Sequence, residues 1–304
     1  MTRVETNPSS QAFADQTEHY TRIVPTSGWV DLRLRDLWEY RELLYFLAWR
    51  DVKVRYQQTV LGAAWAVLVP VLTMVVFSVL FGLLMGRSNR PTVEGVPYPI
   101  STFAALVPWQ LFAFALNQAS NSLVANRNMI TKVYFPRLIA PLAPILSGLV
   151  DFSLAFGVLA IMTGVYHFAT DFVFEPSWRL LLLPAFVLLA IVTALALSMW
   201  LSALNALYRD IKYIVPFLVQ ILMYVSPVVY SASSVMGKDM PAWVKTLYAL
   251  NPLVGVLEGF RWALFGATDV SMPMVGVSSG VVILVFVAGM FYFRRMERLF
   301  ADLA

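Results

Sequence analysis

The sequence predicts an all-α integral membrane protein with six transmembrane helices, an N-terminal amphipathic interface helix, and a re-entrant helical hairpin between spans five and six. Two observations lead to this fold class. The chain of 304 residues is 59% hydrophobic and only 13% charged, which lies outside the range of soluble domains. Its apolar residues gather in windows of about 20 or more, the length needed to cross a hydrocarbon core of roughly 30 Å. Backbone polar groups find no water there, so each window must be helical.

The first part of the chain precedes the spans. Residues 1–28 are polar and predict a poorly ordered cytoplasmic tail rather than a signal peptide. Residues 29–56 predict an amphipathic helix, because apolar side chains recur at spacings of three and four while charged side chains occupy the other face. Trp and Tyr border the apolar face, so we expect this helix to lie in the membrane interface. A soluble packing helix is the alternative.

The rest of the chain, residues 57–304, predicts the membrane domain. Six apolar segments cover most of it: 57–86, 95–126, 138–170, 180–208, 213–237 and 270–293. The only charge that they contain is Asp151. An isolated intramembrane carboxylate is costly. Asp151 could be neutralised by protonation, bond a neighbouring helix, or face an aqueous path.

The loop charges predict the orientation. Lys and Arg resist translocation, so loops rich in them remain in the cytoplasm. Residues 126–138 hold three basic side chains and no acid, whereas residues 168–177 hold two acids and no base. The turn at 209–212 and the C-terminal tail are also basic. We therefore expect both termini, 126–138 and 209–212 in the cytoplasm. The outward loops are then those near 87–94, 168–177 and 236–273.

Residues 236–273 are too polar for a span and too apolar for an open loop. Asn251-Pro252 divides them, because proline removes a donor and disfavours helix in the residue before it. Each piece of about ten residues reaches roughly 15 Å, half the hydrocarbon core. We therefore expect a re-entrant hairpin at 241–265, with a surface hairpin as the alternative. Glu258 and Arg261 are spaced i, i+3 and can pair, which lowers the cost of burying them.

Three classes of membrane protein remain to be weighed. An enzyme would need convergent ionisable or metal-binding groups, yet the chain has two histidines, His19 and His167, and no cysteine; no metal site is predicted. A gradient-driven transporter would favour matching helix interruptions in both halves, and the interruption at 236–273 has no counterpart in the first three spans. The membrane subunit of an ATP-driven exporter explains the absence of a Walker A motif.

The basic loop also favours the third class. Ile130, Val133, Tyr134 and Phe135 are apolar residues among basic ones. A short amphipathic cytoplasmic helix of this kind can dock in a groove on a soluble partner. An interfacial helix resting on lipid headgroups is the alternative.

Several short segments carry a family resemblance. They are Trp49-Arg50-Asp51-Val52-Lys53-Val54-Arg55-Tyr56, Leu61-Gly62-Ala63-Ala64-Trp65, Leu106-Val107-Pro108-Trp109, Lys132-Val133-Tyr134-Phe135-Pro136-Arg137, Tyr208-Arg209-Asp210, Val215-Pro216-Phe217, Leu250-Asn251-Pro252 and Glu258-Gly259-Phe260-Arg261. In this order the chain resembles the permease subunit of type-2 ABC exporters. It is most similar to the polysaccharide and polyol-phosphate branch, which includes O-antigen, capsule, teichoic-acid and cell-wall galactan permeases. Residues 1–28 fall outside the resemblance.

The resemblance implies an assembly and its contacts. A homodimer of this chain would pair with two copies of a nucleotide-binding ATPase subunit, which would bind ATP and Mg; this chain would be a transport subunit that needs no cofactor of its own and binds no nucleic acid. The main coupling helix would be 126–137, with a second contact at 209–212. The residues implied in coupling are Arg127, Ile130, Lys132, Val133, Tyr134, Phe135, Arg137, Arg209 and Asp210. The hairpin would be the outer gate, with Trp243, Tyr248, Asn251, Pro252, Glu258 and Arg261.

The implied cargo is a polysaccharide linked to a polyprenyl-pyrophosphate lipid, exported across the cytoplasmic membrane of a bacterium. Aromatic side chains suit a moving glycan, because they contact sugar C–H surfaces without regard to sequence. Trp109, Phe112, Tyr224 and Tyr230 are the candidates, with a lipid-facing aromatic belt as the alternative. Arg50, Lys53 and Arg55 suit an anionic headgroup, although membrane lipid would attract them equally. A drug or small-lipid exporter of the same fold is the alternative function.

Overall fold

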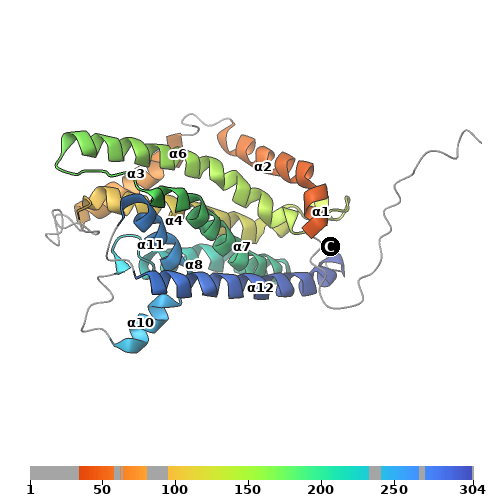
Figure 1. The fold of residues 1–304 in the computed structure, drawn as a ribbon. Helices are drawn as coiled ribbons and strands as arrows, with labels where there is room; N and C mark the ends of the chain where they lie inside the picture. The colour runs from red at the N-terminus through yellow and green to blue at the C-terminus, as the bar shows by residue number, and fades with distance from the viewer. Residues whose placement is uncertain are drawn as a thin grey trace, which may run out of the picture. The chain divides into compact units, whose positions relative to one another are not determined.

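The computed structural model describes residues 34–57, 62, 64–80, 95–232, 241–266 and 271–302, and these fold almost entirely into helices. The predicted tail of residues 1–28, the start of the interface helix at 29–33 and the loop at 87–94 lie outside the described residues. Figure 1 shows the helices in chain order. Their bounds are α1 Leu34–Glu39, α2 Arg41–Tyr56, α3 Ala64–Val79, α4 Tyr98–Ala125, α5 Arg127–Ile130, α6 Ile139–Ala169, η3 Trp178–Leu182, α7 Leu183–Leu207, α8 Ile211–Val225, α10 Ala242–Ala249, α11 Pro252–Phe265 and α12 Met272–Asp302.

Four stretches of the described chain are long and apolar enough to cross a membrane. They are Tyr98–Ala125, Ile139–Ala169, Trp178–Leu207 and Met272–Met296. Two shorter apolar helices, α3 and α8, lie within the first and fifth predicted spans. The protein is therefore a multi-pass membrane protein. Parts of the first predicted span (58–61, 63 and 81–86) and of the fifth (233–237) lie outside the described residues.

Helix α8 ends earlier than the apolar pattern predicts. The apolar pattern continues to residue 237, but the helix ends at Val225. The next residue, Ser226, has an extended backbone, with φ −93° and ψ 154°. Pro227 explains this end, because the ring of a proline disfavours the helical conformation in the residue before it. The residues after α8 therefore leave the helical path while their side chains remain apolar.

The core of the described chain lies around α4. The most apolar window of α4 is 78% buried, against 28% for each of the other three long stretches. Helix α7 packs closely against α4, and it presents small buried residues such as Ala194, Ser198 and Ser202. Small residues at a helix contact let two backbones approach, which is how packing forces hold helices together in lipid. Asn205 Nδ2 adds hydrogen bonds of 3.1 Å to the Ser120 carbonyl and to Asn121 Oδ1.

Candidate functional site

Helix α2 packs against the loop after α4 and against the N-terminal part of α6 (Figure 1). A small hydrophobic cluster holds the three together: Leu47 from α2, Phe135 from the loop, and Ile139 and Ala143 from α6 are all buried. Arg50 adds a polar link, because its Nη2 atom donates to Asn126 Oδ1 at 3.2 Å. The predicted interface helix and the predicted coupling segment therefore form one unit, which we call the α2 module (residues 37–57 and 126–143).

The C-terminal end of α2 is tied to α6 by charge. Arg55 forms an ion pair with Asp151, and the Tyr56 hydroxyl donates to the same carboxylate. Arg55 Nη2 also donates to Ser147 Oγ at 3.0 Å, and the guanidinium lies 3.9 Å from the centre of the Phe114 ring. Of the three fates that the sequence left open for Asp151, the structure shows a bond to a neighbouring helix.

The depth of this polar cluster follows from the length of α6. From Asp151 to the end of the helix at Ala169, the rise is about 27 Å at about 1.5 Å per residue, close to the roughly 30 Å of a hydrocarbon core. Asp151 and Ala169 are therefore separated by nearly the thickness of the core. The apolar residues of α6 before Asp151 are then covered by α2, as the burial of Ile139 and Ala143 shows.

The predicted coupling residues have two kinds of surroundings. The helix in this segment covers only Arg127–Ile130, and turns follow it. Val133 and Tyr134 are 55% and 57% exposed, whereas Phe135 is 4% exposed. The expectation that Phe135 is an exposed docking residue is wrong, because its ring fills the cluster beneath α2. Arg127 and Lys132 are exposed, Ile130 and Arg137 are half-buried, and Arg209 and Asp210 are exposed in the turn between α7 and α8.

Two of the three residues predicted to bind a lipid headgroup already form ion pairs within the chain. Arg50 pairs with Asp51 at 2.9 Å and Arg55 pairs with Asp151. Lys53 instead extends over the Trp49 ring, 5.9 Å from its centre, and has no carboxylate within ion-pair distance among the described residues. Of these three residues, Lys53 is therefore the one whose charge no described carboxylate compensates.

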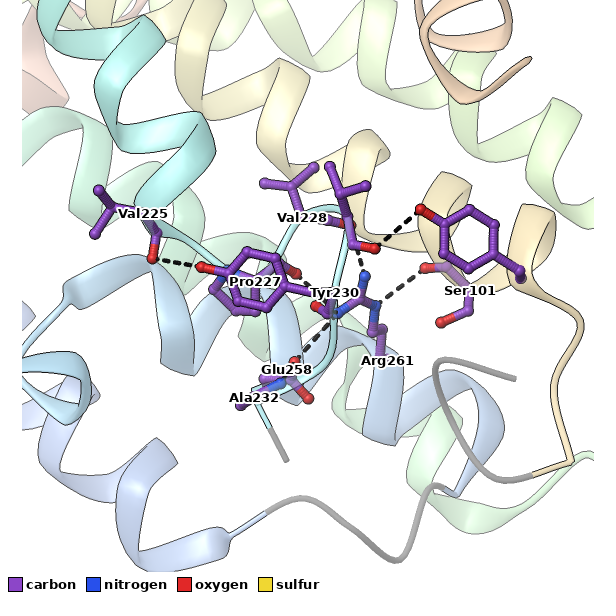
Figure 2. A network of polar contacts seen from close by, with 10 residues as sticks. Ser101, Val225, Pro227, Val228, Tyr230, Ala232, Glu258 and Arg261 are labelled. Carbon is purple, nitrogen blue, oxygen red and sulfur yellow. Dashed lines mark hydrogen bonds and ion pairs between the residues drawn. The ribbon is translucent and has the colours of Figure 1, made fainter. Parts of the chain in front are cut away.

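At the opposite end of the helices, Arg261 holds together the non-helical segment after α8 (Figure 2). The side chain is fully buried. Nη1 donates to the carbonyls of Pro227 at 2.8 Å and Tyr230 at 3.1 Å, and Nη2 donates to Val228 at 2.7 Å. Nε donates to the Ser101 carbonyl on α4 at 3.0 Å. Arg261 thus supplies the donors that a continuing helix would have given to these carbonyls.

Two further side chains complete this carbonyl network. Tyr98 from α4 donates its hydroxyl to Val229, the remaining carbonyl of the run from 227 to 230, at 3.1 Å. The predicted ion pair between Glu258 and Arg261 is present at 3.1 Å, and Glu258 Oε1 also accepts the Ala232 N–H at 2.9 Å. Four consecutive carbonyls are therefore satisfied by side chains, which lowers the cost of an irregular backbone at membrane depth.

Two helices separated by a short break occupy the predicted hairpin. Helix α10 ends at Ala249 and α11 begins at Pro252. Asn251 caps α11, because its Oδ1 atom accepts the Leu253 N–H at 3.0 Å. Its Nδ2 atom donates to Ser226 Oγ, also at 3.0 Å, and so joins the break to the end of α8. Of the other predicted gate residues, Trp243 is exposed and Tyr248 is buried.

The aromatic residues predicted to line the channel differ in solvent exposure. Trp109 and Phe112 are 3% and 0% exposed, with their ring centres 5.6 Å apart in the core around α4. Their assignment to a channel is wrong, because they present no surface to a passing molecule. Tyr224 is 62% exposed on α8. Tyr230 is half-buried, and its hydroxyl donates to the Val225 carbonyl at 2.9 Å.

The sequence analysis missed two features. The partners of Asp151 were not identified, because Arg55 lies in another helix, 96 residues away in the chain. The carbonyl network of Arg261 was missed as well, although Pro227 inside an apolar run was a signal that carbonyls there would need donors other than a helix.

Known proteins agree with this architecture. A family model described as ABC-2 type transporter matches residues 42–265. The O-antigen export system permease protein RfbA of Myxococcus xanthus is 29% identical over 266 residues, which cover 87% of this chain and 96% of that protein. A protein of the same name from Klebsiella pneumoniae is 26% identical over 262 residues, 86% of this chain and 95% of that protein.

A more distant relative is the polysialic acid transport protein KpsM of Escherichia coli. It is 22% identical over 223 residues, 71% of this chain and 78% of that protein. The family match includes most of α2, the coupling segment, both helices at the outer break and the Arg261 network. The chain therefore belongs to the ABC-2 type transporter family, as a permease, the membrane-spanning transport subunit that works with an ATPase.

Proposed function

We propose that this permease exports a polysaccharide linked to a polyprenyl-pyrophosphate lipid across the cytoplasmic membrane of a bacterium. The observation that carries the proposal is the similarity to O-antigen export permeases, which extends over 96% of the Myxococcus protein. The polysialic acid transport protein adds a second kind of polysaccharide system among the relatives. The identity of the cargo is an inference, since a fold alone does not determine which molecule a transporter carries.

The proposed assembly contains two copies of this chain and two ATPase subunits. In it, the ATPase docks on the exposed side of the α2 module at Val133 and Tyr134, with Arg209 and Asp210 as a second contact. The support is that both apolar side chains are more than half exposed in a basic segment. Burying a large apolar side chain at such a contact contributes about 1.5–3 kcal/mol.

The proposed topology has six crossings with both termini in the cytoplasm. Helices α3 and α8, together with their neighbouring residues, form the first and fifth crossings. Helices α10 and α11 form a re-entrant hairpin that opens outward and acts as the outer gate. The charge of the loops supports this orientation, and the break between Ala249 and Pro252 supports the hairpin.

For the channel, we propose the exposed aromatic face of α8. Tyr213, Phe217 and Tyr224 are 70%, 63% and 62% exposed. Their spacing of four and seven residues places them along one side of the helix. A row of aromatic rings offers a polymer contacts that do not depend on its sequence. Lys53 is the proposed contact for the anionic lipid head, because it is the one of the three candidate basic residues of α2 that is exposed and forms no ion pair with a described residue.

Depletion of the permease tests the cargo. We expect lipid-linked glycan to accumulate inside the cell while its synthesis continues, and surface glycan to fall. Expression of the intact chain should restore the surface glycan, and expression of a variant that no longer binds the ATPase should not. Intact surface glycan after depletion, combined with new sensitivity to small hydrophobic drugs, would instead identify a drug or small-lipid exporter.

A further inference from the structure

A cavity of about 270 Å³ lies beside the Arg55–Asp151 pair. Its walls come from the end of α2 and from α3, α4 and α6. Most of the wall is apolar, with Trp65, Val69 and Leu111 among the lining side chains, and the polar groups are Arg55, Tyr56, Gln110 and Asp151. A cavity of mixed character such as this fits an amphiphile better than it fits water or a pure hydrocarbon.

Two side chains in this wall have N–H groups that donate no hydrogen bond within the described residues. No hydrogen bond within the described residues engages the Gln110 side chain, although it lies in the membrane-spanning helix α4. The Arg55 Nε–H likewise makes none there, since Nη1 and Nη2 carry the bonds to Asp151 and Ser147. An amide without a hydrogen-bond partner is unfavourable in a low-dielectric region. Both groups therefore point to a ligand that supplies acceptor oxygens.

The level of the cavity selects among such ligands. In the topology proposed above, α6 ends at the outer boundary of the hydrocarbon core, and Asp151, about one core thickness away, lies at the height of the cytoplasmic headgroups. Oxygen acceptors attached to apolar chains are found at this height in the phosphate and ester groups of lipids. The charge of Asp151 is already compensated by Arg55 and Tyr56, so the carboxylate does not prevent an anionic group from approaching.

We infer that the cavity between α2, α3, α4 and α6 binds the phosphate-bearing end of one inner-leaflet lipid. Its oxygens accept from Gln110 and Arg55, and the first part of its chain lies against Trp65, Val69 and Leu111. The same chemistry is offered by a bulk phospholipid and by a polyprenyl phosphate. The site is a property of this chain alone, so it stands whether or not the cargo proposed above is correct.

Two matched pairs of variants test the site. Ala66→Phe fills the cavity from α3, and Ala64→Phe adds the same ring two residues away on an exposed position outside the lining set. Gln110→Leu removes the amide at nearly constant size, and Gln118→Leu makes the same change at an exposed position of the same helix. Because Gln110→Leu adds no volume, it decides the question if Ala66→Phe fails to fold.

The measurement is native mass spectrometry of the full chain released from nanodiscs of phosphatidylglycerol and phosphatidylethanolamine, with and without added polyprenyl phosphate. We expect one retained lipid on the wild-type chain and on both controls, about fivefold less on Gln110→Leu, and a larger loss on Ala66→Phe. The retained mass identifies the source: survival of phospholipid after the addition assigns a membrane lipid, and replacement assigns the polyprenyl phosphate. Equal retention by all five proteins, or no retained lipid on the wild-type chain, would overturn the inference.

Discussion

Tyr134 and Phe135 are adjacent in the chain and lie in opposite surroundings, the first exposed and the second buried beneath α2. We predict that Tyr134→Ala weakens copurification of the ATPase while the stability of the permease changes by no more than about 0.5 kcal/mol. Phe135→Ala should instead destabilise the permease itself by about 3–5 kcal/mol, because it empties a buried site. Thermal melting of the permease alone and the ATPase-to-permease ratio after affinity purification measure the two effects.

This pair contains its own control, since the two substitutions remove aromatic rings from neighbouring positions. The docking role of Tyr134 is excluded if Tyr134→Ala purifies with a normal ATPase ratio and retains normal transport-stimulated hydrolysis. The burial of Phe135 is contradicted if its removal leaves the melting temperature unchanged.

Arg261 joins α11, α4 and the non-helical segment after α8 through five hydrogen bonds. We predict that Arg261→Gln lowers stability by about 3–5 kcal/mol, because it strands a buried carboxylate and withdraws donors from carbonyls at 101, 227, 228 and 230. Glu258→Gln should cost less, since Gln keeps an acceptor for the Ala232 N–H and the carbonyls still surround the guanidinium. Melting curves in detergent show which of the two variants is less stable. Arg209→Gln, at an exposed turn, is the control. Equal melting curves for Arg261→Gln and this control would show that the carbonyl network of Arg261 does not stabilise the protein.

At the scale of elements, the Arg55–Asp151 ion pair adds a charged contact to the apolar packing between α2 and α6. We predict that Arg55→Gln and Asp151→Asn each destabilise the chain, and that the double variant is little worse than either single one. Each single change leaves one partner without its counter-charge, whereas the double change removes both charges. A double-mutant cycle on melting free energies should give a coupling of about 1–3 kcal/mol. Additive effects would show that the pair contributes nothing to the contact between the helices.

The long elements were predictable from the sequence, and their lateral contacts were not. The windows 95–126, 138–170, 180–208 and 270–293 anticipate the four long stretches, because length and hydropathy alone decide whether a segment can cross a bilayer. The break before Pro252 was also predictable, since proline acts through local geometry. The end of α8 at Val225 was not predicted, because Pro227 was read as part of an apolar run.

The burial of individual side chains could not be predicted from the sequence, for a physical reason. Phe135 and Tyr134 have the same apolar character in the same basic loop, and only the position of α2 decides which ring is covered. Trp109 and Phe112 were assigned to a channel by their aromatic type, but α4 is surrounded by its neighbours and both rings are buried. Residue type gives the chemistry that is available, whereas tertiary packing decides which surface uses it.

At the scale of the whole molecule, the orientation can be tested directly because the chain has no cysteine. We predict that Ile130→Cys reacts with an impermeant thiol reagent only after the cells are permeabilised, and that Glu175→Cys reacts in intact cells. In the proposed topology, basic residues keep the first loop in the cytoplasm, and the second loop, which lacks them, faces outward. Labelling of Ile130→Cys from outside intact cells would contradict the proposed topology.

The Arg261 network also has a consequence for the order in which the protein is made. The carbonyls of residues 227–230 leave the ribosome some thirty residues before the guanidinium that three of them require. Until residue 261 has emerged, those three oxygens lack the side-chain donor that they have in the folded protein, and leaving them unpaired in dry lipid would be costly. The backbone of residues 227, 228 and 230 can therefore reach its final hydrogen-bonded arrangement only after α11 has been synthesised, so this part of the permease is completed late.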